Sequence, residues 1–234
     1  MSIAKKVKQI ILNLEDGAVV TYGDLSYLQN FNAVSKVLSR LARDGIIKRL
    51  EKGRYYKTSF SKFGEKGPLE SDVIKSLSAG GYVSGNVIYN ELGLTDQIAN
   101  EIVIIGKRYN CKKKIGNLSV KYQKREGRFN QKNRKYLQIL DAIKDIKKIP
   151  GVNVNEALEK LIKIIKDMSN TEQIRLAKYG EEYKPMVRAL LGAILEELEI
   201  PCSEELKRTL NQLTKYKIGI KANLLSNLSE WRIE

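Results

Sequence analysis

Five residues at helical spacing carry only hydrogen-bonding or positively charged groups: Ser35, Lys36, Ser39, Arg40 and Arg43. Ammonium and guanidinium groups pair with phosphate oxygens, and arginine also pairs bidentately with the edge of guanine. Two more basic residues, Lys52 and Arg54, stand on either side of Gly53 a short distance later. The chemistry that these residue types offer is recognition of a polyanion.

Residues suited to catalysis are scarce. The chain has no histidine, which removes the commonest general base and the commonest metal ligand. Its two cysteines, Cys111 and Cys202, are too few for a disulfide framework or a zinc site of usual spacing. No glycine-rich phosphate loop is present. Three adjacent carboxylate pairs fall on or beside predicted helices and are interpreted as solvated faces: Glu181-Glu182, Glu196-Glu197 and Glu204-Glu205. We therefore expect no enzyme, no metal and no cofactor.

The charge of the chain is strongly positive, at +15 over 234 residues. Residues 1–66 carry a net +7, residues 67–132 carry +5 and residues 133–234 carry +3. A basic surface favours nucleic acid first and an anionic membrane second. No apolar run approaches the roughly 18 residues that span a bilayer, and the N-terminus lacks the pattern of a secretory signal. We therefore expect a cytoplasmic protein without a membrane partner.

The elements that position the five polar residues lie within Thr21–Lys57. Val34, Val37, Leu38 and Leu41 recur at three- and four-residue spacing, which predicts one helix with a buried side. A shorter helix is expected before it, carrying Tyr22, Leu25 and Leu28, and Asp44-Gly45 ends the longer one. Two β-rich runs, IIKRL and RYYK, follow as a hairpin. Helix, turn, polar-faced helix and hairpin is the order of a winged helix-turn-helix.

The whole chain reads as α+β and mostly helical, in three parts. Residues 1–62 form the winged helix-turn-helix, 63–132 a small mixed α/β segment with a basic hairpin, and 133–234 a helical bundle. Residues 58–70 lack periodicity and are interpreted as a linker. In the bundle, Gly192 within an Ala/Leu face predicts close helix approach, within the domain or across a dimer, and Trp231 is expected to pack back onto the helices.

The basic hairpin has two interpretations of similar weight. Gly116-Asn117 is a good two-residue turn, and the stretch 107–135 holds twelve Lys and Arg against one acidic residue. Lysines commonly keep a sheet edge solvated and free of aggregation. The same residues could instead form a second polyanion contact, carried by Lys107, Arg108, Lys112, Lys113, Lys114, Lys121, Lys124 and Arg125.

Several strings resemble one bacterial family: AKKVKQIILNL, VVTYGDL, SKVLSRLARDGIIKRLEKGRYYK and GYVSGNVIYNELGL. The sequence is similar to AbiEi-like proteins, the antitoxin-type transcriptional regulators of abortive-infection, or type IV toxin–antitoxin, loci. GYVSGN followed by NELGL is the more discriminating part, and the similarity extends through EIVIIG and LQILDAIKDIKKIPG. The resemblance implies a DNA-binding winged helix, repression of the protein's own operon, and a nucleotidyltransferase-type toxin that is countered without a stable complex.

Within a helix-turn-helix frame we favour DNA contact by the polar helix face over a merely solvated one. Asn32 and Arg40 are the expected base readers, because these side chains pair bidentately with adenine and guanine. Phosphate contacts are expected from Lys36, Arg43, Lys52 and Arg54, with Ser35 and Ser39 on the same face. The expected partner is double-stranded DNA of the protein's own promoter, read as inverted repeats by a homodimer. The alternative is an adaptor whose winged helix contacts protein and whose basic hairpin binds RNA or an acidic partner.

Overall fold

The structure is a computed structural model that describes residues 2–62, 64–127, 129–201 and 203–234. It is 44% helical and 17% strand, so the fold mixes α and β structure, as expected. Two residues of the sequence argument, Arg128 and Cys202, lie outside the described residues. Among the helices of the described ranges, none is both long and apolar enough to cross a membrane.

The chain divides into two compact units. The first consists of Met1–Ala79 together with Lys112–Val120, and the second of Gly80–Cys111 together with Lys121–Glu234.

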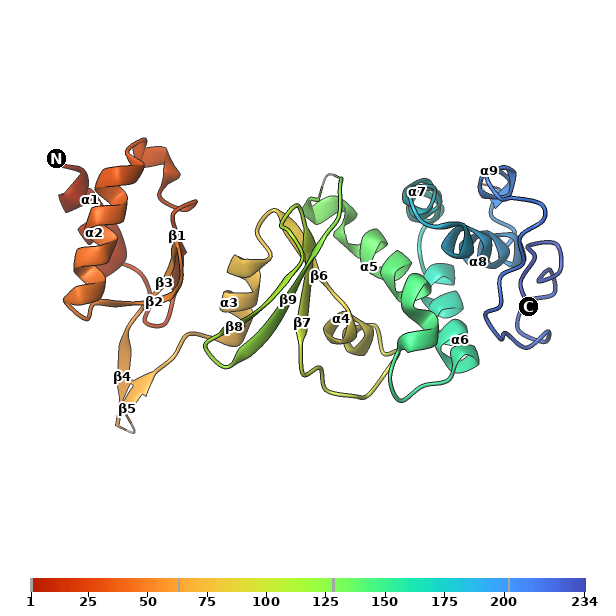
Figure 1. The fold of residues 1–234 in the computed structure, drawn as a ribbon, viewed down its shortest axis with the longest axis horizontal. Coiled ribbons are helices and arrows are strands. Elements are labelled where there is room, and N and C mark those ends of the chain that lie inside the picture. The colour runs from red at the N-terminus through yellow and green to blue at the C-terminus, as the bar shows by residue number, and fades with distance from the viewer. Residues whose placement is uncertain (1, 63, 128, 202) are drawn as a thin grey trace. The chain divides into compact units, whose positions relative to one another are not determined.

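The first unit begins with two helices packed on a three-stranded sheet (Figure 1). Its sheet is antiparallel with the strand order β1-β3-β2. The elements in chain order are α1 (Ile3–Leu12), β1 (Val19–Thr21), the 3₁₀ turn η1 (Ser26–Leu28), α2 (Phe31–Arg43), β2 (Ile47–Glu51) and β3 (Arg54–Lys57).

The core of this part comes from the predicted stripes. Val34, Leu38 and Leu41 of α2 are buried with Val7 and Ile11 of α1 in one hydrophobic cluster. Burying a side chain of this size contributes about 1.5–3 kcal/mol, and the same cluster contains Val20, Ile47 and Tyr55 of the sheet, so it holds α2 against both α1 and the sheet. The predicted apolar side of the helix is therefore confirmed.

The helix expected after Thr21 is present only as the single turn η1. Just before this turn, Thr21 and Asp24 exchange hydrogen bonds, at 2.7 and 2.8 Å to the carboxylate and 3.3 Å to the hydroxyl. Gln29 then adopts a left-handed φ of 53°, which stops any continuation. The segment between these two points is too short for a full α-helix.

Residues 58–70 contain a hairpin rather than the irregular linker that their sequence indicated. Strand β4 (Ser59–Ser61) pairs antiparallel with β5 (Gly64–Lys66), and α3 (Glu70–Leu77) follows. Glu65 on β5 accepts a hydrogen bond from the Tyr56 hydroxyl at 3.2 Å. This partner lies on β3, so the contact that holds the hairpin cannot be seen in local periodicity.

The second unit begins at the sheet with strand order β6-β7-β9-β8, against which α4 and α5 pack (Figure 1). The predicted strand EIVIIG and the predicted hairpin around Gly116-Asn117 are both confirmed, while β6 was not expected. Gly81 lies so close to the carbonyl oxygen of Ile105 that a Cβ there would collide with it. Its elements are β6 (Gly81–Ser84), α4 (Asn86–Glu91), β7 (Ile102–Gly106) and the end of β9 (Leu118–Lys124), whereas β8 (Cys111–Ile115) and the start of β9 fall within the Lys112–Val120 segment of the first unit, apart from Cys111.

Helices follow, as the sequence predicted. Asn130 caps α5, Asn153 caps α6, and Ser169 with Glu172 forms a capping box at α7, so backbone N–H groups at these starts are satisfied. Pro185 occupies the first turn of α8, where its missing N–H costs nothing. The elements are α5 (Gln131–Asp145), the 3₁₀ turn η2 (Ile146–Lys148), α6 (Val154–Lys166), α7 (Asn170–Gly180), α8 (Pro185–Glu197) and α9 (Ser203–Arg208).

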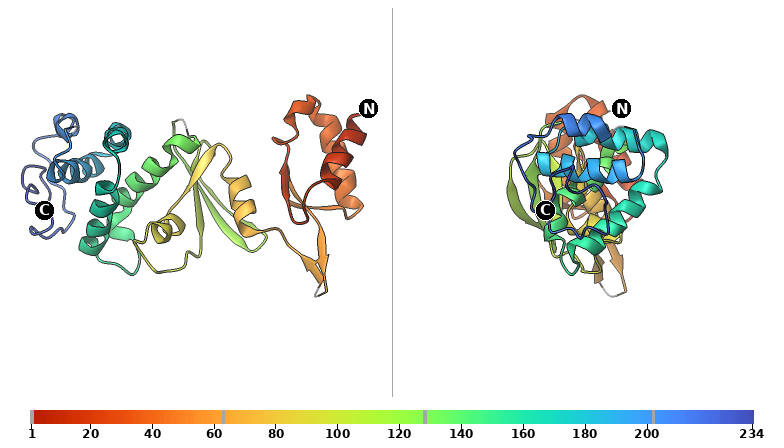
Figure 2. Two further views of the ribbon diagram at one scale, coloured as in Figure 1. Left: turned by 180° about the vertical axis from the view of Figure 1, so that it is seen from behind. Right: turned by 90° about the vertical axis from the view of Figure 1, so that its right-hand side faces the viewer.

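The tail after α9 packs back onto the helices, as expected for Trp231 (Figure 2). The indole is fully buried, and it lies directly over Gly192 of α8. The close approach predicted at Gly192 is therefore made by the ring of Trp231, and not by another helix.

The pair Glu196-Glu197 is more than a solvated face. The Glu196 carboxylate accepts the indole N–H of Trp231 at 2.6 Å and the amide of Asn227 at 2.8 Å. Glu197 accepts the backbone N–H of Ser226 at 2.9 Å. These two carboxylates hold the tail on α8, which corrects the interpretation drawn from the sequence.

We expect Gly192→Ala to lower the free energy of unfolding by about 1–3 kcal/mol, because the new Cβ forces the Trp231 ring to move. This steric cost exceeds the gain of about 1 kcal/mol that alanine normally brings to a helix interior. Urea denaturation followed by Trp231 fluorescence measures the change. Gly67→Ala is the matched control, since its Cβ would meet nothing within 4 Å. An unfolding midpoint for Gly192→Ala equal to that of the wild type would contradict the packing described here.

Candidate nucleic-acid interface

The side of α2 opposite its buried stripe is exposed and polar. Arg43 has 79% of its side chain accessible, and its ion pair among the described residues is a long contact of 3.9 Å with Asp44. The helix is therefore anchored by one side and offers the other to solvent. The predicted residues that lie exposed on it are Asn32, Lys36, Ser39, Arg40 and Arg43.

One serine on α2 ties the helix to the segment that follows β1. Ser35 is half-buried, and its hydroxyl lies 3.0 Å from that of Tyr22. Ser39 lies exposed on the polar side of the helix. The predicted role of Ser35 as part of an open face is thus replaced, for its hydroxyl, by an internal hydrogen bond.

The hairpin β2–β3 has its tip next to the start of α2. Gly53 has a φ of +81°, and a Cβ there would come within 2.8 Å of the Tyr22 ring. The backbone N–H of Tyr22 donates to the Gly53 carbonyl at 3.1 Å. Glycine is therefore required at this turn for both its conformation and its size, and it places the exposed Lys52 at the tip.

The field at this place is positive. Burial acts to raise the pKa of Tyr22, but hydrogen bonds with Ser35 and Tyr55, together with the charges of Arg49 and Lys52, bring it below its ordinary value. For Tyr55, burial is the largest cause and raises the pKa. The charges of Arg49 and Lys52 act in the same direction as these hydrogen bonds, and such positive charge also attracts phosphate.

Arg54 does not belong to the exposed group. Its side chain is 13% accessible and forms an ion pair with Glu51, and its guanidinium donates to the carbonyl of Ser76 at 3.0 and 3.2 Å. These partners occupy the guanidinium N–H donors that a phosphate would need. We therefore remove Arg54 from the residues predicted to contact DNA.

Sequence reasoning missed two residues at this face. Phe31 opens α2 and is 62% exposed as a residue, with its ring set edge-on against Tyr22 at 4.7 Å between centroids. Arg49 is exposed on β2 and contributes to the field at Tyr22. Phe31 looked like part of a turn, and Arg49 looked like part of an ordinary β run, so neither carried a signal of its own.

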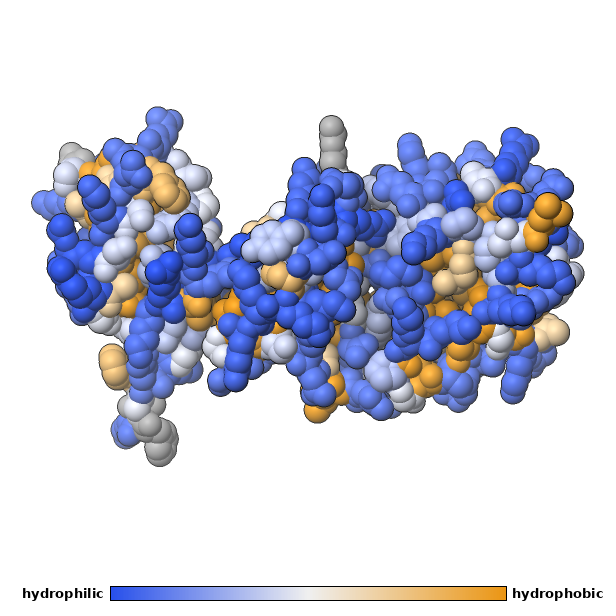
Figure 3. All heavy atoms as spheres, viewed as in Figure 1, coloured by the Kyte–Doolittle hydropathy of each residue, from blue (hydrophilic) through white to orange (hydrophobic). Residues whose placement is uncertain are grey.

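The basic hairpin β8–β9 divides between the two units. Its tip belongs to the first unit, where Lys112 and Lys114 are exposed and Lys113 contacts Glu51 at 3.6 Å. In the view of Figure 3, hydrophilic residues gather over these strands. The tip therefore adds positive charge to the same unit that carries α2.

The remaining predicted residues of this set lie in the second unit. Lys107 is exposed, Arg108 lies over the Tyr122 ring at 4.7 Å, Lys124 pairs with Glu126 at 3.0 Å, and Lys121 lines a cavity. Arg125 is turned inward, because its guanidinium lies 4.0 Å over the Tyr183 ring and 3.6 Å from the Asp141 carboxylate. Arg125 is therefore structural, and its predicted contact with a polyanion is corrected.

We expect Arg54→Gln to destabilise the first unit by about 1–3 kcal/mol, because Glu51 and the Ser76 carbonyl each lose a charged donor. Lys52→Gln, which also removes one positive charge, should change stability by less than about 0.5 kcal/mol because the residue is exposed. Thermal and urea unfolding of the two variants make the comparison. Equal stabilities would mean that Arg54 is not the structural residue described here.

Comparison with known proteins gives a family and a distant structural neighbour. The neighbour is a crystal structure of the RV2827C protein from Mycobacterium tuberculosis, with 13% identity and a TM-score of 0.46 over 92% of this chain and 84% of that one. None of the curated proteins matches. The family model described as "Family of unknown function (DUF6088)" matches residues 3–176, which is more than half of the sequence. The chain therefore belongs to the DUF6088 family.

Proposed function

We propose that this protein is a DNA-binding transcriptional regulator whose first unit reads DNA as a winged helix. The observation that carries the proposal is the seating of α2, which is buried on one side and exposed with Asn32, Lys36, Arg40 and Arg43 on the other. The order of α1, β1, η1, α2 and the β2–β3 hairpin, with sheet order β1-β3-β2, supports it.

Dimensions and charge agree with this use of α2. A helix of 13 residues is about 20 Å long and fits a major groove about 12 Å wide. In the proposed complex, Asn32 and Arg40 contact base edges, and Lys36, Arg43 and Lys52 contact phosphates. The exposed ring of Phe31, at the first position of α2, is suited to the methyl group of thymine.

The hairpin tip extends the proposed footprint. Lys112 and Lys114 are exposed in the same unit, and Lys113 is attached to β2 through Glu51. Non-specific attraction of the DNA backbone grows with the number of phosphates that such lysines neutralise. We therefore assign these lysines to positioning and not to base recognition.

The experiment is a gel shift with the protein's own promoter and a random duplex. We expect Arg40→Ala to cost about 1–3 kcal/mol on the preferred sequence and almost nothing on the random one. Lys52→Ala should weaken both duplexes about equally and reduce the slope of log affinity against log salt by about one unit.

Lys160→Ala is the matched control for these variants, since it removes one exposed positive charge from α6. The proposal fails if the wild-type protein shows no preference for its promoter over random DNA. It also fails in its assignment of residues if Lys160→Ala and Arg40→Ala lose sequence preference alike.

On the strength of the sequence resemblance we also propose that the regulator counters a nucleotidyltransferase-type toxin encoded beside it. Co-expression with the neighbouring gene should restore growth that the neighbour alone inhibits. Growth that stays inhibited would exclude this antitoxin role, and it would leave the DNA-binding proposal to be judged by the gel shift.

A further inference from the structure

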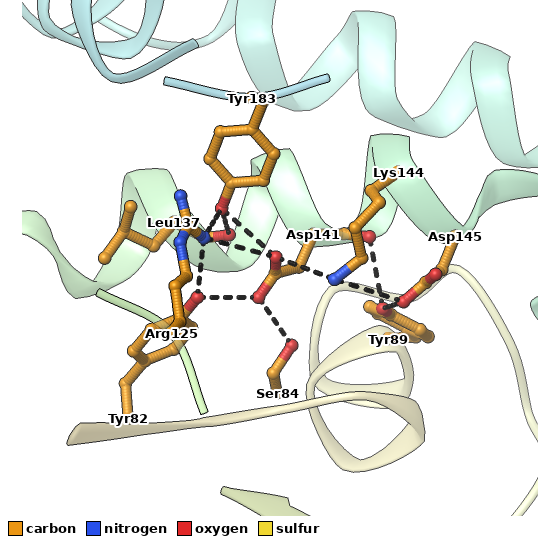
Figure 4. A network of polar contacts seen from close by, with 9 residues as sticks. All are labelled: Tyr82, Ser84, Tyr89, Arg125, Leu137, Asp141, Lys144, Asp145 and Tyr183. Carbon is orange, nitrogen blue, oxygen red and sulfur yellow. Dashed lines mark hydrogen bonds and ion pairs between the residues drawn. The ribbon is translucent and has the colours of Figure 1, made fainter. Parts of the chain in front are cut away.

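A cavity of about 410 Å³ lies in the second unit beside a buried network of polar side chains. Four members of that network also line the cavity: Ser84, Tyr89, Lys144 and Asp145 (Figure 4). The cavity is thus built against a rigid floor. Its other walls come from β7, β9, η2 and the loop before β7.

The centre of the network is the carboxylate of Asp141 on α5, which is 1% exposed. One oxygen accepts the hydroxyls of Tyr82 and Ser84 at 2.8 Å each, and the other accepts the hydroxyl of Tyr183 and the ammonium of Lys144 at 3.1 and 3.0 Å. All of these partners are drawn in Figure 4. Asp141 therefore has no capacity left for a ligand, and it fixes the position of Lys144.

The second carboxylate of the floor is also satisfied from within the protein. Asp145 accepts the hydroxyl of Tyr89 at 2.8 Å and lies 3.6 Å from the Lys144 ammonium. Burial first and the charge of Asp145 second raise the pKa of Tyr89, so this phenol stays a donor. Glu101, the remaining carboxylate of the lining, is engaged in an interaction of its own.

Positive charge at the cavity is in excess. Lys121 of β9 and Lys148 of η2 line it together with Lys144. Within the part of the chain that the structure describes, no ion pair joins Lys121 or Lys148 to a carboxylate. Two ammonium groups without acidic partners, beside a third that is held in place, favour an anion with several oxygens.

The lining also offers side-chain amides. Asn86, Gln97, Asn100 and Gln123 present donors and acceptors to the same space. The volume falls in the range of small-molecule sites, about 300–1,000 Å³, and inorganic phosphate alone would leave most of it empty. The amides are suited to a polar scaffold such as a sugar or a nucleobase.

We propose that this cavity binds a small phosphate monoester, in which Lys121 and Lys148 contact the phosphate and the amides contact the polar scaffold that carries it. Lys144 completes the phosphate site as a positioned cation. The site is separate from the α2 surface and goes beyond the DNA-binding function. Its failure and the failure of DNA binding are distinguishable, because they rest on different residues and different assays.

The experiment is isothermal titration of the full chain with AMP, CMP, GMP, UMP and ribose 5-phosphate, compared with the four unphosphorylated nucleosides and with inorganic phosphate. At least one phosphate monoester should bind saturably, and at least about 10-fold more tightly than its unphosphorylated counterpart or inorganic phosphate. If the nucleotides bind and ribose 5-phosphate does not, the cavity is a nucleotide site. If the nucleotides and ribose 5-phosphate bind equally well, it is a sugar-phosphate site. Either result supports the proposal.

Variants then test the assigned residues with the best ligand of that series. Lys121→Gln and Lys148→Gln should each weaken binding by about 10-fold, because each removes a charge-assisted hydrogen bond. Lys121→Arg keeps the charge and should bind the ligand more tightly than Lys121→Gln does, and Lys160→Gln, on the exposed face of α6, should leave binding unchanged. Circular dichroism checks that each variant is folded. If the glutamine variants are not folded, the affinity of Lys121→Arg is measured in their place.

Three outcomes would overturn the proposal. One is the absence of saturable binding by any of the five phosphate monoesters. Another is equal affinity for a nucleotide and its nucleoside, which would leave the lysines without a role. The third is binding that survives Lys121→Gln and Lys148→Gln in folded protein.

Discussion

A carboxylate taken out of water must be surrounded by donors, and the second unit is organised by this requirement at Asp141. Its partners come from β6, from the residue after β9, from α5 itself and from the segment before α8. An ionised group in such a place is costly unless every lone pair is used. The sheet, α5 and the start of α8 must therefore come together in one arrangement for the charge to be buried at all.

The same requirement explains why Arg125 points inward. Its guanidinium is stacked on Tyr183 and bonded to the hydroxyl of Tyr82 at 3.1 Å, so it offsets the negative charge of Asp141 while keeping both phenols in place. Burial and the nearby carboxylate raise the pKa of Tyr82 and of Tyr183, so these groups remain hydrogen-bond donors. The network thus limits how the β9 end and α5 can move relative to each other.

Much of the architecture could be predicted from the sequence, because it depends on local periodicity. The stripe of Val34, Leu38 and Leu41 and the turn at Gly116-Asn117 are signals of this kind. The β4–β5 hairpin and strand β6 were missed, since Glu65 and Gly81 depend on partners far along the chain. Sequence reasoning also placed Arg54 and Arg125 at a surface, because a basic residue gives no sign of an internal partner until Glu51 and Asp141 are located.

In the candidate sites too, features set by local spacing could be predicted, and features that depend on distant partners could not. Exposure of Asn32, Lys36, Arg40 and Arg43 follows from helical spacing, so it was predictable. The role of Ser35 in holding α2 was not, because Tyr22 comes from another segment. The cavity beside Asp141 left no trace in the sequence, since its lining is drawn from separate elements between Ser84 and Pro150.

The seating of Trp231 over Gly192 has a consequence for the order of synthesis. The helices α5 to α8 are synthesised before this tryptophan, so the space beside Gly192 is not filled until the tail is present. Closing it requires a side chain made about forty residues later, together with its hydrogen bond to Glu196. Nascent chains stalled before Trp231 therefore expose an apolar surface that a chaperone can recognise, and release of the tail ends that exposure.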